Sequence, residues 1–315
     1  MLTLVTGGAG FIGSNLADEL IRQGHEVRIL DDLSTGFAEN LPPDALFFEG
    51  DLCDEELVAE AVDGVEVVFH QGARGSVTKS VETPLLTDHS NIHGTLTVLE
   101  AARRAGVRRV VSASSSSIYG GVAPRPTRET EPLTPRSPYA VSKIAGEHYL
   151  QVYWELFGLE TVALRYFNVY GPRQSPKSLY AAAVPRFIDA MANGRPATIY
   201  GDGGQTRDFT YVADVVDALV RASTSVKAPL VGPMNVGGGR RISILDLVGS
   251  IAKALGFTGR PVHEPARVGD VRDSLADIRR AMDALAWKPA TSLDQGIARL
   301  VGTARRSGAV AGQNP

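Results

Sequence analysis

The 315-residue sequence has one cysteine, no long apolar run and no excess of basic residues. Because Cys53 stands alone, no disulfide can form within the chain, and a reducing compartment is expected. No apolar run approaches the roughly 18 residues of a membrane span. The start, MLTLVTGGAG, lacks the basic segment of a signal peptide. The sequence therefore predicts a cytoplasmic protein with no membrane partner.

The charge balance argues against polyanionic partners. The chain carries 32 basic and 35 acidic residues, a formal net charge of −3. A nearly neutral chain has no electrostatic reason to bind nucleic acid or an anionic membrane. What remains is a globular protein, 43% hydrophobic and 21% charged, that is long enough to bury a large core.

Short apolar runs alternate with helical periodicity along the first half of the chain. The apolar runs predict strands at 2–6, 26–30, 45–50, 65–71, 107–114 and 160–166. The periodic segments predict helices at 11–24, 54–62, 91–106 and 138–158 and, in a mixed second part, at about 181–193, 211–223, 243–256 and 292–303. The alternation predicts an α/β fold with a Rossmann-like, doubly wound parallel sheet and a smaller mixed α/β C-terminal domain.

Three glycines stand between the first predicted strand and the first predicted helix. In VTGGAGFIG, Gly7, Gly10 and Gly13 allow a tight turn and a close approach to a pyrophosphate, which the helix N-terminus can bind. Glycine triplets are weak evidence alone, but this one has the required strand–turn–helix context. A tight turn without a ligand is the alternative.

The second predicted strand ends in ILDDLSTG, which places Asp31 where a carboxylate can bond the adenosine ribose hydroxyls. No Arg or Lys lies in 31–36 to bind a 2′-phosphate, so NAD is favoured over NADP. The ends of the next two predicted strands add candidates at the same edge: Asp51, Leu52, Gln71, Gly72 and Ala73. Asp51 could equally cap the helix that follows it.

A tyrosine and a lysine lie one helical turn apart in SPYAVSKIAGEHY. Tyr139 and Lys143 share a helix face, although chance also produces such pairs. The serine run SASSSSIYG follows a predicted strand and therefore faces the ligand crevice. The two segments together supply a hydroxyl, a phenol and a cation. The charges of Lys143 and of a cationic nicotinamide would lower the pKa of Tyr139 toward physiological pH.

At this point the sequence resembles the extended short-chain dehydrogenase/reductase family, and within it the nucleotide-sugar 4-epimerases of the UDP-glucose (UDP-galactose) 4-epimerase type. The glycine loop, SSSSIYG, SPYAVSK, LRYFNVYGPR, GDGGQTRDFTYVADV and RVGDVRDSLAD match in order, to about residue 300. The resemblance implies an NAD-dependent isomerase of carbohydrate metabolism. It would interconvert UDP-glucose and UDP-galactose through a transient 4-keto sugar, and UDP-N-acetylglucosamine and UDP-N-acetylgalactosamine as a second pair of substrates.

The resemblance also implies an organisation in domains and protomers. Residues 1–166 would form the NAD-binding domain and 167–315 mainly the UDP-sugar-binding domain, with the chain crossing back around 205–225. A homodimer would form through the helices at about 91–106 and 138–158. Apolar residues beyond the needs of one core face support it: Leu96, Leu99, Tyr149, Tyr153 and Trp154.

The motifs and the resemblance together assign site residues. Tyr139 would be the catalytic base, Lys143 the ribose-binding residue that lowers its pKa, and Ser115 the active-site hydroxyl. The expected NAD-binding residues are Gly7, Gly10, Phe11, Ile12, Gly13, Asp31, Asp32, Leu33, Ser34, Thr35, Gly36, Asp51, Leu52, Gln71, Gly72, Ala73, Ser90, Tyr139, Lys143 and Phe167. The expected substrate-binding residues are Ser115, Ser116, Ser117, Tyr139, Asn168, Ala183, Val184, Tyr200, Arg207, Arg267, Asp270 and Ser274.

Some of these assignments have alternatives. Arg207, which would hold the substrate diphosphate, could instead pair at the surface with Asp208 or Asp214. Ser274 stands where epimerases restricted to glucose and galactose carry a bulky aromatic residue, so it predicts space for an N-acetyl group. The alternative is that Ser274 caps a helix beginning near Leu275.

Two positions near the expected cofactor site depart from the pattern of the relatives, and a histidine pair lies nearby in the sequence. Arg74 has no assigned role, and Ser90 stands where some relatives use Asn, although Asn91 is adjacent. His89 and His93 share a helix face but lack a third ligand, so no metal site is predicted.

The alternative function is a related enzyme that diverts the keto sugar. A 4,6-dehydratase needs a pair of acid–base groups where Ser116 and Ser117 stand, so dehydration is disfavoured. A UDP-glucuronate 4-epimerase or decarboxylase is harder to separate, because one cation near the sugar could bind the carboxylate. The intact set of Ser115, Tyr139 and Lys143 disfavours a catalytically silent NAD-binding regulator.

Overall fold

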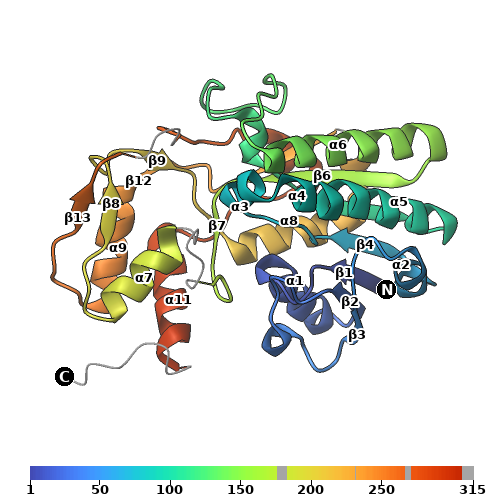
Figure 1. The fold of residues 1–315 in the computed structure, drawn as a ribbon, viewed down its shortest axis with the longest axis horizontal. Helices are drawn as coiled ribbons and strands as arrows, with labels where there is room; N and C mark the ends of the chain where they lie inside the picture. Colours follow the sequence, from blue (N-terminus) through green and yellow to red (C-terminus); the bar gives the residue numbers. More distant parts are fainter. Residues whose placement is uncertain (176–182, 231, 267–270, 307–315) are drawn as a thin grey trace.

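A seven-stranded sheet forms the larger of two lobes in the computed structural model, which describes residues 1–175, 183–230, 232–266 and 271–306 (Figure 1). The strand order is β11-β6-β5-β4-β1-β2-β3, and every neighbouring pair is parallel. The strands are β1 (Leu2–Thr6), β2 (Glu26–Asp31), β3 (Leu46–Glu49), β4 (Val67–His70), β5 (Arg109–Ser115), β6 (Glu160–Tyr166) and β11 (Met234–Val236). The order reverses between β1 and β4, where a doubly wound sheet opens a ligand crevice.

Helices cover both faces of this sheet (Figure 1). One face packs against α1 (Phe11–Arg22), α8 (Val212–Thr224) and α10 (Arg279–Leu285), and the other against α2 (Glu55–Val62), α5 (Gly94–Arg104) and α6 (Pro138–Phe157). Leu4 and Val5 of β1 are fully buried in the two different cores. Successive side chains of a strand point to opposite faces, so a strand covered on both sides is apolar throughout.

The smaller lobe has its own apolar core. It contains α7 (Ala183–Ala192), α9 (Ile244–Leu255) and α11 (Leu293–Arg306), together with the paired strands β8 (Thr198–Tyr200) and β13 (Val262–Glu264). Two further strand pairs connect segments at the lobe boundary: β9 (Thr206–Arg207) with β12 (Ile242–Ser243), and β7 (Val169–Tyr170) with β10 (Thr210–Tyr211). After β10 the chain crosses to the larger lobe, where it forms α8 and β11. It then returns to the smaller lobe with α9.

The short elements are α3 (Val77–Glu82), α4 (Pro84–Asp88), the π-helical turn η2 (His89–His93) and the 3₁₀ turns η1 (Ala38–Asn40), η3 (Ser116–Tyr119) and η4 (Ala228–Leu230). The predicted fold class is confirmed, and each of the six strands predicted in the first half is present. The helix predicted from residue 91 becomes α-helical only at Gly94, after the π-helical turn. The division at residue 166 stays a prediction. Among the described helices, none is long and apolar enough to cross a membrane.

Candidate active site

A cavity of about 1070 Å³ follows the carboxyl ends of the strands and extends toward the smaller lobe. Most of the predicted cofactor residues line it: Gly7, Gly10, Phe11, Ile12, Gly13, Asp31, Asp32, Ser34, Thr35, Asp51, Leu52, Gln71, Gly72, Ala73, Ser90, Tyr139, Lys143 and Phe167. Leu33 and Gly36 are not among the lining residues. Both lie against the Asp31 carboxylate instead. The Leu33 N–H donates to Asp31 Oδ1 at 2.9 Å, and Gly36 leaves room for that oxygen, because a Cβ there would stand only 2.9 Å from it.

The glycine loop brings two main chains together. A Cβ on Gly13 would stand 2.1 Å from the carbonyl oxygen of Gly7, closer than real Cβ contacts come. Gly7 has φ 69°, and a Cβ there would lie 2.7 Å from Cα of Gly72 in the loop after β4. Side chains are excluded at these positions, so a pyrophosphate can approach the loop and the N-terminus of α1 closely.

The groups along the cavity fit NAD. The Asp31 carboxylate is only 7% exposed, accepts from the Ala9 N–H at 3.0 Å and from Leu33, and burial raises its pKa. A carboxylate at the end of the second strand is the expected partner of the adenosine ribose. Gln71 Nε2 and Ser117 Oγ are buried beside the cavity without a hydrogen-bond partner in the described part of the chain. A ligand with many oxygen and nitrogen atoms would supply those partners.

Ser115, Tyr139 and Lys143 meet at the middle of the cavity. Ser115 ends β5, and Tyr139 lies in the first turn of α6, which Ser137 caps by accepting from the Ala140 N–H at 3.2 Å. Lys143 lies one turn later. Its Nζ donates to the Ala113 carbonyl at 2.9 Å and stands 5.9 Å from the centroid of the Tyr139 ring.

Burial dominates the protonation of the tyrosine–lysine pair. It raises the pKa of Tyr139, and the hydrogen bond with Ser115 lowers that pKa only in part. Burial also lowers the pKa of Lys143 to about 8, against the opposing effect of the Glu147 carboxylate. In the protein alone the pKa of Tyr139 is thus raised, because burial outweighs its hydrogen bond, and the lowering predicted from the sequence was for the site with a cationic nicotinamide bound. Additional positive charge near the phenol is therefore needed to favour the phenolate.

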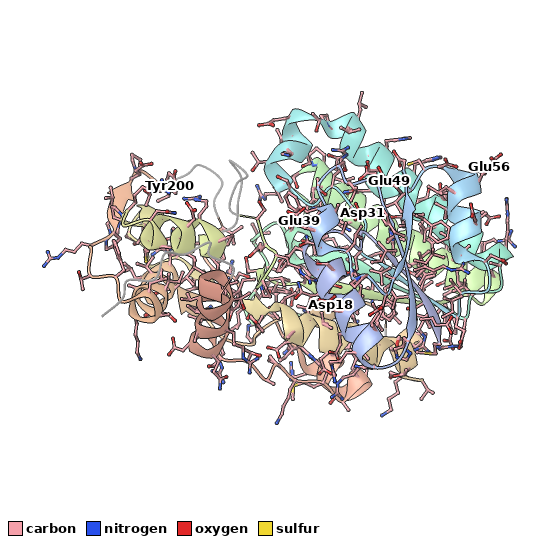
Figure 2. The ribbon with its side chains drawn as sticks, turned by 90° about the horizontal axis from the view of Figure 1, so that it is seen from below. Asp18, Asp31, Glu39, Glu49, Glu56 and Tyr200 are labelled. Carbon is pink, nitrogen blue, oxygen red and sulfur yellow. The ribbon has the colours of Figure 1, made fainter. Side chains whose placement is uncertain are left out.

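The predicted substrate residues fall into two adjacent spaces. Ser115, Ser116, Ser117, Tyr139, Asn168, Arg207 and Ser274 line the large cavity. Ala183, Val184 and Tyr200 line a second cavity of about 270 Å³, which Asn168, Val169 and Arg207 share with the first. Figure 2 labels Asp31 on the larger lobe and Tyr200 on the smaller one, so the two ends of the site are held by different lobes. Arg267 and Asp270 lie outside the described residues.

The structure decides the alternative for Ser274 and bears on the one for Arg207. The Asp208 carboxylate accepts from the main-chain N–H of Ala276 at 2.9 Å, and the Asp214 carboxylate accepts from the main-chain N–H groups of Ala290 and Thr291 and from the Thr291 hydroxyl. The capping alternative for Ser274 is wrong, because no helix begins near Leu275 and α10 starts only at Arg279. The Ser274 hydroxyl instead accepts from Asn168 Nδ2 at 3.4 Å.

Sequence reasoning missed several lining residues, among them Arg125, Tyr166, Gln174 and Asp273. Tyr166 donates through its hydroxyl to Gln71 Oε1 at 2.9 Å, which fixes the amide beside the cofactor loop. Its position as the last residue of a strand, beside the last residue of β5, was the available signal. The others come from loops without a spacing pattern, so no comparable signal existed.

One group of possible metal ligands occurs among the described residues. The ligand atoms of Asp51, Cys53 and His89 lie within 4.8 Å of one another. Burial raises the pKa of the Cys53 thiol to about 12, which keeps the poorly ligating protonated form. His89 stacks on His93 with ring centroids 5.5 Å apart. The absence of a metal site stays a prediction.

The strand order, the glycine loop and the acidic end of β2 define a dinucleotide-binding protein of the Rossmann class. The chain belongs to the NAD dependent epimerase/dehydratase family, whose model matches residues 3–237. It is 44% identical over 310 residues to a UDP-glucose 4-epimerase of Mycolicibacterium smegmatis, covering 96% of this chain and 97% of that protein.

Two solved structures are similar over nearly the whole chain. A UDP-glucose 4-epimerase from Thermotoga maritima, solved with UDP-glucose, is 39% identical with a TM-score of 0.93, covering 98% of this chain and 99% of that one. A UDP-N-acetylglucosamine 4-epimerase from Methanobrevibacter ruminantium, in complex with UDP-N-acetylmuramic acid, is 37% identical with a TM-score of 0.90, covering 96% and 98%.

Proposed function

We propose that this protein is an NAD-dependent UDP-hexose 4-epimerase that interconverts UDP-glucose and UDP-galactose, and also UDP-N-acetylglucosamine and UDP-N-acetylgalactosamine. The observation that carries the proposal is a pair of adjacent spaces: the large cavity runs from the glycine loop past Ser115, Tyr139 and Lys143, and the second cavity, beside Tyr200, shares lining residues with it. A dinucleotide and a sugar nucleotide can share these spaces end to end. The 44% identity to a UDP-glucose 4-epimerase over almost the whole chain supports it.

The residues divide the work of a C4 epimerisation. When bound, NAD supplies a hydride acceptor and donor for C4, so the reaction passes through a transient 4-keto sugar. Tyr139 takes the proton of the 4-hydroxyl and later returns it, while Ser115 bonds the reacting oxygen. Lys143, whose Nζ stands 5.9 Å from the centroid of the Tyr139 ring, would contribute positive charge beside the phenol and so favour the phenolate.

Arg207 and Asn168 would hold the nucleotide part of the substrate at the junction of the two cavities. Arginine suits a diphosphate because its guanidinium bonds two oxygens at once. Ala183, Val184 and Tyr200 would surround the uracil, with Arg267 and Asp270 as further proposed contacts. Binding by the nucleotide leaves the keto sugar free to turn and present its other face.

Incubation of the purified protein with single UDP-sugars tests the proposal. We expect UDP-glucose to yield UDP-galactose, and UDP-N-acetylglucosamine to yield its C4 epimer, when products are resolved by chromatography or NMR. UDP-glucuronate tests the alternative of a uronate 4-epimerase or decarboxylase. Arg125 lines the cavity as a cation, but its Nε and Nη2 donate to the carbonyls of Asp273 and Gly121, both at 2.8 Å. Conversion of UDP-glucuronate, without conversion of the other two sugars, would contradict the proposal and favour the uronate 4-epimerase or decarboxylase.

A homodimer is the proposed assembly, although four of the five residues expected at its interface do not support it, Trp154 being the half-buried exception. Leu99 and Tyr153 are buried in the chain's own core, and Leu96 and Tyr149 pack against it, so they do not support an interface. The exposed apolar residues lie on three adjacent helices: Val77 and Val81 on α3, Leu85 and Leu86 on α4, and Val141, Val152, Leu156 and Phe157 on α6. Leu85 is 85% exposed. Exposed apolar side chains gathered on neighbouring helices support the proposed interface.

Sedimentation at micromolar concentration checks the assembly, and a monomer would contradict it. We expect Leu85→Asp to shift the protein toward monomer, because it places a charge on the patch. Val226→Asp, at an equally exposed position outside the patch, should leave the dimer intact. For the compartment, the single cysteine supports a cytoplasmic location.

A further inference from the structure

Arg74 is a cation in the large cavity whose charge no described acidic residue balances. It follows β4, lines the cavity and is partly buried. Its Nε donates to Ser90 Oγ at 3.2 Å. Among the residues that the structure describes, no carboxylate forms an ion pair with its guanidinium. Partial burial of an unpaired charge costs hydration energy, and an anionic ligand in the cavity would offset that cost.

The main chain at Arg74 is fixed from both sides by Asn91. The Arg74 N–H donates to Asn91 Oδ1 at 2.7 Å, and Asn91 Nδ2 donates back to the Arg74 carbonyl at 3.3 Å. Asn91 is 3% exposed and also bonds the Ser142 hydroxyl of α6 at 3.0 Å. The side chain of Arg74 therefore starts from a rigid position. Preorganisation of this kind lowers the entropy that a ligand contact costs.

The position of Arg74 beside the glycine loop indicates which anion it meets. Gly72, two residues earlier, lies so close to Gly7 that a Cβ on Gly7 would stand 2.7 Å from its Cα. The loop that carries Arg74 thus packs on the loop that receives the dinucleotide pyrophosphate. At the substrate end, Arg207 of β9 is the corresponding cation, and it comes from the boundary with the smaller lobe.

The adenosine end is an unfavourable place for another anion. Asp31, Asp32 and Asp51 all line the cavity there. We infer that the Arg74 guanidinium binds the diphosphate of NAD from the side opposite the N-terminus of α1, with Ser90 orienting its Nε. This contact would keep the cofactor bound while the sugar is in its keto form. The inference rests on the proposed cofactor site and is independent of which sugar is turned over.

Ligand fragments test the inference without using turnover. In Arg74→Gln, we expect the affinities for NAD and for ADP to fall by the same factor, about tenfold or more, because a charge-assisted bond is lost. Adenosine, which has no phosphate, and UDP, which occupies the substrate end, should bind as before. Arg74→Lys should recover part of the loss. Isothermal titration of protein stripped of cofactor gives these constants, and the NAD content of the purified holoenzyme gives a second readout.

Arg136→Gln is the matched control, since Arg136 is another cation that lines the cavity. It should leave ADP affinity unchanged. An equal loss in Arg136→Gln would mean a general charge effect, and an equal loss for adenosine would mean a structural role. Weaker UDP binding with unchanged ADP binding would assign Arg74 to the substrate. Each of these results overturns the inference, and none of them depends on epimerase activity.

Discussion

The two ends of the cavity are built in different ways. At the cofactor end, Gly7, Gly13 and Gly72 bring main chains so close that no side chain fits between them. At the substrate end, side chains from separate segments converge, among them Asn168, Arg207 and Ser274. Figure 2 labels one residue of each end, Asp31 on the larger lobe and Tyr200 on the smaller one.

This difference predicts how each end responds to substitution. A Cβ added against rigid main chain cannot be accommodated by a rotamer change, so effects at the cofactor end should be abrupt. A side chain changed at the substrate end alters one contact among several, so effects there should be graded and selective for one substrate.

Gly13→Ala should have the largest effect. Its Cβ would stand 2.1 Å from the Gly7 carbonyl oxygen, so the glycine loop must move. We expect the purified variant to lack bound NAD and to lose roughly 1–3 kcal/mol of unfolding free energy through overpacking. Cofactor content and thermal unfolding measure both effects.

Gly249→Ala is the control for this change. Gly249 lies in α9 with no atom within 4 Å of an added Cβ, and the variant should keep NAD and gain roughly 0.5–1 kcal/mol of stability. A Gly13→Ala protein with normal NAD content would show that the loop is not rigid, and the comparison between the ends would fail.

Tyr139→Phe should slow epimerisation by about 10²–10⁴-fold, because the proton acceptor is removed. Binding of NAD and UDP should be unchanged, since the ring remains. Tyr149→Phe, on the same helix and packed against the core, should turn over at the normal rate. Steady-state kinetics with UDP-glucose provide the measurement. Near-full activity of Tyr139→Phe would remove the residue from the mechanism.

Asp31→Ala should weaken NAD binding by roughly 10–100-fold, the range expected for lost hydrogen bonds to a charged group. The preference for NAD over NADP should narrow, because the carboxylate also repels a 2′-phosphate. The loss of the bonds from Ala9 and Leu33 affects both cofactors alike, so the ratio isolates the ribose contact. An unchanged ratio would mean that Asp31 only supports the loop.

Ser274→Tyr should have the most selective effect. The bulky ring would fill space beside the sugar and abolish turnover of UDP-N-acetylglucosamine, while UDP-glucose is still converted. Ser274→Ala should keep both activities, because its only described side-chain bond is a long one from Asn168. The two substrates are compared on each variant. Equal losses on both sugars would mean that Ser274 sets no size limit.

The cofactor end was the more predictable of the two from sequence. Its glycines, Asp31 and the pair Tyr139 and Lys143 depend on spacing within single βα units, which periodicity reveals. Strand β11 was missed because Asn235, fully buried, interrupts a short apolar run. Its side chain accepts from the Tyr119 hydroxyl at 2.8 Å and donates to the Thr127 carbonyl at 2.9 Å, partners more than 100 residues away.

The contacts around Arg74 and the pKa of Tyr139 likewise depend on residues far apart in the sequence, so local patterns could not predict them. The rigidity of Arg74 depends on Asn91, a side chain of another helical segment, and no local pattern contains that pairing. The pKa of Tyr139 depends on how deeply tertiary packing buries the phenol, whereas the sequence shows only that a lysine is near. Spacing predicts which groups meet, and packing decides their protonation.

Epimerisation of UDP-glucose labelled with deuterium at C4 tests the central claim most directly. The account predicts that the C4–H bond is broken and remade inside one cavity, without exchange with water. UDP-galactose should therefore carry the deuterium at C4, and it should form more slowly than from unlabelled substrate. Mass spectrometry and NMR of the product read the label. UDP-galactose with hydrogen from solvent at C4, or no C4 epimer at all, would contradict the account.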